Sequence, residues 1–470
     1  MSVTVTPSAG TPTALTPRLR LVLVLLLAAQ FMLAVDFSIL NVALPVIGTG
    51  LGFSLARLQW IGTSFALCAA GFTLLFGRVA DLFGRRRLFL GGLVVLAAAS
   101  LAGGLAQSPG VLIAARVCQG LATAAVTPAG LSLLTTSFPE GPLRERALGL
   151  NGALMSAGFT TGAVLGGLLT DLLSWRWSFF VNVPVALAVL LIAPAVIAES
   201  RPEERPKLDV PGAVTATSGL LAVVLGLTRA GEHGWGAPAT LVPLAAGAAL
   251  LLTFRAVERR APAPLVPLGV LGKRSVAWGN VVGLVAFLTE TSLVFLLTLY
   301  LQEVLGFSPL AAGLSFGVLG AGTVVGGSVA PRVIGRFGAP RVILAGGLVQ
   351  ALFTAALLGL GTGHSSLRLL LAATFAGGVG NMLVIVGFMV TATSGLADHE
   401  QGLATGLATM TQQIGITMGT PVMSAVATAA MSGTGAVAVL GGLRTAIAVN
   451  AAVALVGTLA GGFFLRRGTR

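Results

Sequence analysis

Charged residues are scarce in this 470-residue sequence. Only 9% of its residues are Asp, Glu, Lys or Arg, whereas 55% are hydrophobic. Soluble globular domains carry about 25% charged residues, so this composition excludes an ordinary soluble protein. Apolar runs recur along the whole chain, and many reach the length of about 18 residues or more that can cross the hydrocarbon of a bilayer. The sequence therefore predicts a polytopic membrane protein.

Residue types that form metal and covalent sites are equally rare. The two cysteines, Cys68 and Cys118, lie within apolar runs and lack the spacing of a disulfide framework or a metal site. The three histidines fall in predicted loops: His233, His364 and His399. The loops between the apolar runs are short as well. We therefore expect no metal site, no cofactor and no enzymatic activity.

The apolar runs predict an all-α protein. Only helices and closed barrels can satisfy their backbone hydrogen bonds in lipid. The runs are continuous and lack the alternation of barrel strands, which favours helices. Fourteen spans are expected, at residues 20–46, 58–80, 88–107, 110–135, 146–173, 178–198, 212–229, 237–256, 277–302, 309–331, 341–361, 366–392, 402–429 and 441–465.

The basic residues predict the orientation. The net charge is +13, but the basic side chains lie in short loops between spans, which argues against a nucleic-acid partner. Cytoplasmic loops carry an excess of Lys and Arg, and an inside N-terminus makes 22 basic residues cytoplasmic. Five would lie outside: Arg57, Arg176, Arg229, Arg368 and Arg444. Arg outnumbers Lys by 26 to two, as in GC-rich bacterial genomes. We expect a bacterial cytoplasmic membrane protein with both termini in the cytoplasm.

An internal repeat divides the chain. The segment RVADLFGRRRLFLGG, which begins at Arg78, resembles RVIGRFGAPRVILAGG, which begins at Arg332. Both copies fall in cytoplasmic loops, so two halves of six helices share one orientation, which is the construction of one large transporter fold. The expected parts are a disordered N-terminus (1–17), an N-terminal six-helix bundle (18–198), a cytoplasmic linker (199–211), two inserted helices (212–256), a cytoplasmic loop (257–276), a C-terminal six-helix bundle (277–465) and a cytoplasmic tail (466–470).

The first copy of the repeat resembles the signature cytoplasmic loop of the major facilitator superfamily. The positions that carry the resemblance are Gly77, Asp81, Gly84, Arg85, Arg86 and Arg87. Glycines permit a tight turn, and the Asp can accept charge-assisted hydrogen bonds from an Arg or a helix N-terminus. The resemblance implies a gate that latches the two halves together on the cytoplasmic side. The alternative is a basic loop that serves only topology.

Two later helices carry further signatures of that superfamily. Helix 110–135 contains RVCQG, whose Arg116 is expected to face the bundle interior. It would either form a static ion pair with Asp36 or tune a protonatable carboxylate. Helix 146–173 has glycines with the spacing of the antiporter motif: Gly158, Gly162, Gly166 and Gly167. Ala163 replaces the usual Pro of this motif, and small-residue packing is the alternative to an antiport role.

Several other stretches resemble the fourteen-helix drug:proton antiporters of the superfamily (DHA2-type) in particular. They include SWRWSFFVNVP, LYLQEVLGFSPLAAG and GLATGLATMTQQIG, so the resemblance runs from the first predicted helix to the last. It implies two six-helix bundles plus two inserted helices. It also implies a small-molecule substrate that is exchanged for protons by alternating access, and we expect a monomer in the lipid bilayer.

Two acidic residues lie well inside predicted spans. Asp36 and Glu290 are expected near mid-depth, at comparable positions of the two halves. A carboxylate at the middle of a membrane helix costs about 2.5–3.5 kcal/mol on insertion scales, which makes such residues candidates for function. We expect Asp36, Arg116 and Glu290 to couple protons to transport. The alternatives are a static ion pair for Asp36 and a hydrogen bond between helices for Glu290.

Polar and aromatic residues of the same helices are the candidates for a substrate cavity. They are Asn41, Gln119, Phe295, Tyr300, Gln302, Met410, Gln412 and Gln413. The leading hypothesis is export of amphipathic drugs or antibiotics, driven by the proton gradient without a cofactor. The alternatives are export of an endogenous metabolite, lipid or amino-acid-like compound, and a non-transporting membrane sensor. An ATP-driven pump is not favoured, since the nearest phosphate-loop segment has Pro267 and Arg274 where Gly and Ser or Thr are required.

Overall fold

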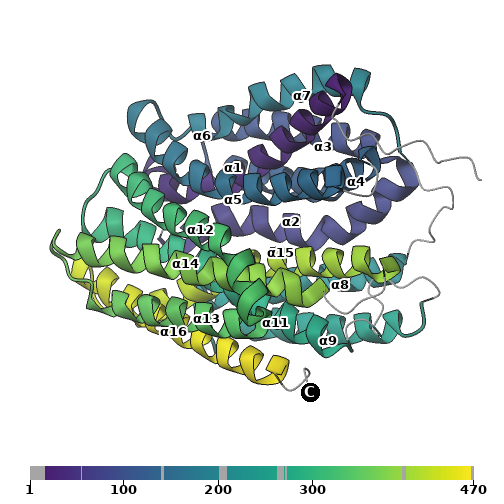
Figure 1. The fold of residues 1–470 in the computed structure, drawn as a ribbon. Helices are drawn as coiled ribbons and strands as arrows, with labels where there is room; N and C mark the ends of the chain where they lie inside the picture. The colour runs from purple at the N-terminus through teal and green to yellow at the C-terminus, as the bar shows by residue number, and fades with distance from the viewer. Residues whose placement is uncertain are drawn as a thin grey trace, which may run out of the picture.

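The computed structural model describes residues 16–53, 55–138, 142–200, 209–261, 269, 272–393 and 398–466, and these residues form helices and short connections without a strand (Figure 1). The N-terminal half contains α1 (Pro17–Leu51), α2 (Leu55–Phe83), α3 (Arg85–Gly104), α4 (Pro109–Ser137), α5 (Pro142–Leu172), α6 (Trp177–Phe180) and α7 (Asn182–Val196). Next come α8 (Val210–His233) and α9 (Pro238–Glu258). The C-terminal half contains α11 (Arg274–Leu299), which continues as a π-helical turn (Tyr300–Val304), and α12 (Pro309–Phe337), α13 (Ala339–Ala356), α14 (Ser366–Thr393), α15 (Asp398–Ala430) and α16 (Ala436–Arg466).

The all-α prediction is confirmed over the described residues. Each of the fourteen expected spans coincides with a helix, and the sixth is divided into α6 and α7. Eleven helices are long and apolar enough to cross a membrane, among the residues searched. The chain is therefore a multi-pass membrane protein, and the total of fourteen spans stays a prediction. Residues 1–15 and 201–208, which include parts of the expected N-terminus and linker, lie outside the described residues.

Local sequence explains where several helices begin. Proline stands in the first turn of α1, α4, α8, α9, α12 and α13, where its missing N–H costs no helical hydrogen bond. Side chains cap three of these starts. Thr16 Oγ1 accepts the N–H of Leu19 at 3.2 Å, and the side chains of Asp209 and Ser308 cap α8 and α12 in the same way.

The two halves have the same internal packing. In the N-terminal half α1 packs on α5, α2 on α4 and α3 on α7; in the C-terminal half α11 packs on α15, α12 on α14 and α13 on α16. The halves contact each other mainly through two helix pairs, α5 with α12 and α2 with α15. In Figure 1 the first half forms the upper layer and the second half the lower one. This is the arrangement expected of parallel repeats.

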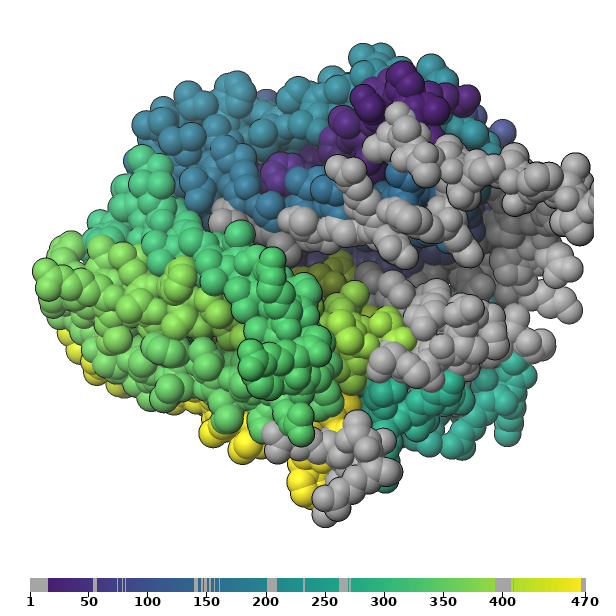
Figure 2. Space-filling model, viewed as in Figure 1, coloured from purple at the N-terminus to yellow at the C-terminus, as the bar shows by residue number. Residues whose placement is uncertain are grey.

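Among the described residues, the hydrophobic cores join the halves at one end only. One core contains residues of both halves, such as Ile47, Phe179, Leu301 and Leu443, which lie where α1 and α11 end and α16 begins. In Figure 2 the blue and green surfaces meet at this end, on the left. Towards the other end, each half has a core of its own in the described residues. The end that carries the α2–α3 and α12–α13 turns is therefore not held together by a shared core.

The inserted helices cover one of the two seams between the halves. Helix α8 contacts both α2 and α15, and Thr217 Oγ1 of α8 donates to the carbonyl oxygen of Gly71 in α2 at 2.6 Å. Helix α9 packs against α8 and is the least buried of the candidate spans. Helices α5 and α12 form the opposite seam.

Candidate functional site

The side chain of Asp36 is fully buried and its carboxylate receives three donors. Arg116 Nη1 of α4 donates to Oδ2 at 3.1 Å. Gln119 Nε2 donates to Oδ1 at 3.1 Å, and Asn182 Nδ2 of α7 donates to the same oxygen. Ser100 of α3 completes the cluster, because its hydroxyl accepts hydrogen bonds from Gln119 and Asn182. This pattern suits a deprotonated carboxylate, which can only accept hydrogen bonds.

Arg116 is fixed from several sides. Its Nε donates to the carbonyl oxygen of Ile61 at 3.1 Å, and Nη1 also donates to Gln119 Oε1 at 2.9 Å. The guanidinium lies 4.1 Å from the ring centroid of Phe65, a favourable cation–π distance. The expected ion pair between Asp36 and Arg116 is therefore present.

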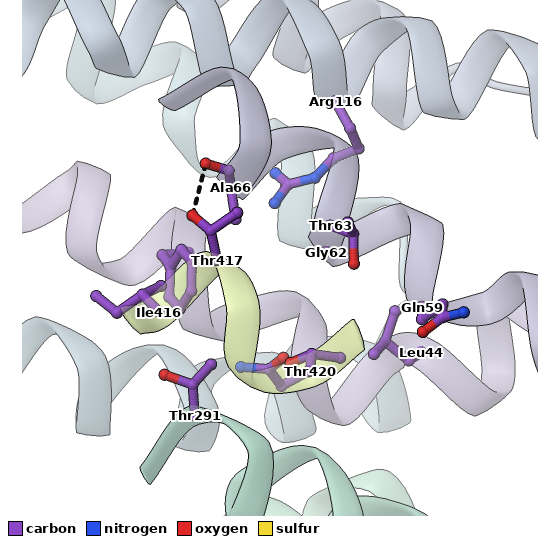
Figure 3. A pocket seen from close by; sticks show the side chains of 12 residues that line it. Leu44, Gln59, Gly62, Thr63, Ala66, Arg116, Thr291, Ile416, Thr417 and Thr420 are labelled. Carbon is purple, nitrogen blue, oxygen red and sulfur yellow. Dashed lines mark hydrogen bonds between the residues drawn. The ribbon is translucent and has the colours of Figure 1, made fainter. Parts of the chain in front are cut away.

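A pocket lies beside this pair, between the two halves (Figure 3). It is a small, partly open hollow bordered by α1, α2 and α4 of the first half and by α11 and α15 of the second. The guanidinium of Arg116 points into it in Figure 3. Half of the twelve lining residues have neutral polar side chains: Asn41, Gln59, Thr63, Thr291, Thr417 and Thr420. The hydroxyl of Thr417 donates across the interface to Ala66 O at 2.9 Å.

The C-terminal half has an uncharged counterpart of the Asp36 cluster. Gly158 of α5 approaches Phe31 and Ala34 of α1. Gly415 of α15 approaches Leu284 and Phe287 of α11, so Leu284 corresponds to Phe31 and Phe287 to Ala34. This register places Thr289 of α11 where α1 has Asp36. Like Asp36, Thr289 contacts the sixth helix of its half, and it also contacts the third. Its hydroxyl accepts a hydrogen bond from Gln350 at 2.9 Å, and its carbonyl oxygen accepts one from Asn450 at 3.1 Å.

Asp36 and Glu290 therefore occupy comparable positions of the two halves, with an offset of one residue. Glu290 corresponds to Phe37, a residue of the pocket wall, and one helical step turns a side chain by about 100°. Glu290 is half-buried, lies beside Asn381 of α14, and is not among the residues that line the pocket. The two acids lie at similar depth but face different surroundings.

The structure brings only some of the predicted cavity residues together. Asn41 lines the pocket, and Gln119 belongs to the Asp36 cluster. Phe295 and Tyr300 are buried in the core shared by the halves, so they are packing residues here. Gln302 Nε2 donates to Val42 O of the other half at 2.7 Å. Met410, Gln412 and Gln413 are half-buried on α15 and do not line the pocket.

The predicted cytoplasmic gate forms contacts within one half. The turn is made by Gly84, whose φ is +110°, while Gly77 lies inside α2. The backbone N–H groups of Arg86 and Arg87 donate to the carboxylate of Glu199 at 3.0 and 3.3 Å, and Arg85 bonds to Ser200. Glu199, which the sequence did not single out, thus holds the N-terminus of α3. Nothing is described for the side chain of Asp81.

The glycines of α5 make two kinds of close contact. Gly158, Gly162 and Gly166 lie against the backbone of α1, so α5 packs tightly within its own half. Gly167 faces the other half, and a Cβ there would lie 2.5 Å from Pro309 O of α12. Ala163 is buried at the same seam, where its carbonyl oxygen approaches Gly313. The motif therefore serves packing inside a half and contact between halves.

Comparison with known proteins places this chain among membrane transporters. A family model described as Major Facilitator Superfamily matches residues 26–420. The chain is 41% identical over 423 residues to the cephamycin export protein of Amycolatopsis lactamdurans, covering 87% of this chain and 85% of that protein. It is 39% identical over 413 residues to a puromycin resistance protein of Streptomyces alboniger, covering 87% and 82%.

A solved structure has the same fold. It is a bacterial homologue of the human lysosomal transporter Spinster in an inward-facing and unoccupied conformation. The match covers 96% of this chain and 98% of the other, with a TM-score of 0.67 and 17% identity.

Proposed function

The chain belongs to the major facilitator superfamily, and from that premise we propose that it is a proton-coupled antiporter that exports amphipathic drugs or antibiotics from a bacterial cell. The observation that carries the proposal is the buried Asp36–Arg116 ion pair at the wall of a pocket between the halves. Relatives named for export of cephamycin and resistance to puromycin support the substrate class.

The positive-inside rule supports an inward-facing state. The α2–α3 turn carries Arg85, Arg86 and Arg87, and such basic clusters face the cytoplasm. The shared core then lies on the outer side, and the halves are separate towards the cytoplasm. In this state the pocket would be loaded from inside the cell.

The Asp36–Arg116 pair offers a way to link proton and substrate. While Asp36 is deprotonated, it holds Arg116 in place at the pocket wall. A proton on Asp36 would weaken this pair and free Arg116 to move. The guanidinium would then leave its position in the pocket wall. Proton and substrate would then oppose each other's binding, which is the reciprocal linkage an antiporter needs. A membrane potential adds about 2.3 kcal/mol per charge per 100 mV.

Glu290 is the second proposed proton site. It is the other acid inside a predicted span and lies beside Asn381, at a depth close to that of Asp36. Because it stands apart from the Arg116 pair, it can exchange protons without disturbing that pair. A helix-to-helix hydrogen bond is the competing role.

Transport into everted membrane vesicles tests the function. The panel contains cephamycin C, puromycin, lincomycin and tetracenomycin C, with uptake and proton movement recorded together. We expect wild-type vesicles to accumulate at least one compound with proton movement in the opposite direction. Asp36→Asn should abolish the coupled uptake and Glu290→Gln should reduce it. Full coupled uptake by both variants would refute the site assignment. Export of endogenous compounds alone would favour the metabolite exporter. No transport at all would favour the non-transporting membrane sensor.

A further inference from the structure

The pocket keeps hydrogen-bond donors without partners. Thr63 is 1% exposed and its hydroxyl has no partner, and the same holds for Asn41 Nδ2. Arg116 uses Nε and Nη1 for its bonds to Ile61, Asp36 and Gln119, and no bond of Nη2 is found among the described residues. An unsatisfied buried polar group costs about 1–3 kcal/mol. Two such groups, Thr63 Oγ1 and Asn41 Nδ2, lie at the pocket beside the Arg116 guanidinium, and an acceptor atom of a ligand would satisfy them.

Two other hydroxyl groups of the pocket are already engaged. The hydroxyl of Thr291 donates to Phe287 O at 2.9 Å, and that of Thr417 donates to Ala66 O and Gln413 O. Asp36 does not line the pocket, and both its oxygens accept bonds from the cluster behind it. The pocket therefore presents no free carboxylate to a positively charged ligand in this conformation.

We propose that this pocket recognises an acceptor oxygen, either carbonyl or carboxylate, on the exported molecule. Arg116 Nη2, the Thr63 hydroxyl and Asn41 Nδ2 would donate to it. Arg116 remains bonded to Asp36 while the ligand is bound, so the ligand needs no net charge. The inference rests on the proposed function for the identity of the pocket as the substrate site. It adds a selection rule, because cations without an acceptor oxygen find no partner here despite the two buried acids.

Binding to the purified protein tests the rule. Calorimetric titrations would use cephamycin C, which carries carboxylates and carbonyls; puromycin, which carries a carbonyl but no carboxylate; and tetraphenylphosphonium, which has no acceptor. We expect the antibiotics to bind and tetraphenylphosphonium to bind at least tenfold more weakly. Thr63→Val keeps the side-chain shape and removes the hydroxyl, so it should weaken antibiotic binding about fivefold, the effect of one hydrogen bond.

Two matched variants sharpen the comparison. Thr291→Val should weaken binding less than Thr63→Val, because the Thr291 hydroxyl already donates to its own helix. Thr298→Val, a buried threonine with the same kind of intrahelical bond, lies outside the pocket and should leave binding unchanged.

The outcomes separate this inference from the proposed function. An effect of Thr63→Val on cephamycin C alone identifies a carboxylate ligand, and an effect on both antibiotics identifies a carbonyl; either result supports the inference. Equal binding of tetraphenylphosphonium, equal effects of Thr63→Val and Thr291→Val, or no antibiotic binding overturns it. If the binding pattern holds but vesicles export neither antibiotic, the inference stands and the proposed function fails.

Discussion

At the scale of single residues, the Asp36–Arg116 pair is the most demanding feature of the chain. Both side chains are at most 1% exposed, and two buried charges are tolerated only when they are paired and further hydrogen-bonded. Here Gln119 and Asn182 supply those additional bonds. The pair is therefore a unit, and the effect of changing one member depends on the other.

A double-variant cycle tests this dependence. Arg116→Gln alone leaves the Asp36 carboxylate buried without its counter-charge, and we expect a loss of stability of about 3–5 kcal/mol. Combining it with Asp36→Asn removes the orphaned charge, so the double variant should recover most of the loss. Thermal unfolding in detergent measures both. A double variant no more stable than Arg116→Gln would contradict the account.

The sequence predicted this pair but missed its neighbours. A charged residue inside an apolar run stands out because its insertion is costly, which is why Asp36, Arg116 and Glu290 could be found. Thr63 and Asn182 are neutral, and a single polar residue in a membrane helix carries no comparable signal. The one-residue offset of Glu290 could not be predicted either, because the sequence gives helix boundaries only to within a few residues.

At the scale of helices and turns, the repeat provides a natural comparison. Gly84 and Gly338 each precede the third helix of their half with positive φ, +110° and +81°. A Cβ on Gly84 would lie 2.8 Å from the Glu199 carboxylate, whereas a Cβ on Gly338 would meet nothing within 4 Å. The two turns share backbone strain but differ in one contact.

Alanine at these two positions should therefore have unequal effects. Both substitutions add strain of about 1–3 kcal/mol, but only Gly84→Ala also displaces Glu199 from the α3 N-terminus. We expect a larger drop in melting temperature for Gly84→Ala than for Gly338→Ala. In a Glu199→Ala background the two drops should become equal. Equal drops in the wild-type background would show that Glu199 does not hold this turn.

The helices themselves were largely predictable, and their contacts were not. Continuous apolar runs located every expected helix, since length and composition decide which segments can span a bilayer. The break between α6 and α7 has no such signal. Nor does the position of α8 over the α2–α15 seam, because that depends on packing between segments far apart in sequence.

At the scale of the whole molecule, the described residues of the two halves share a core at one end, and we expect the halves to pivot about that end. Gly167 touches Pro309 across that end, and Val at position 167 would force α5 and α12 apart. Opening there should accompany closing at the opposite end, where Phe83 and Phe337 are exposed on equivalent turns.

Spin-label distances can follow this motion. Labels on Phe83→Cys and Phe337→Cys, with Cys68 and Cys118 replaced, report on the end where the cores are separate. We expect Gly167→Val to shift the distribution to shorter distances. Gly91→Val, at a glycine with no neighbour within 4 Å, is the matched control and should leave the distribution unchanged. A distribution unaltered by Gly167→Val would argue against a pivot at this seam.

The central claim is that the Asp36–Arg116 pair links proton movement to export. The most direct measurement uses liposomes that contain the wild type or the Asp36→Asn/Arg116→Gln double variant, with an imposed gradient of puromycin or cephamycin C and a trapped pH dye. The account predicts that wild-type protein moves protons against the flow of antibiotic and that the folded double variant moves none. The same proton-to-antibiotic ratio in both proteins would contradict it.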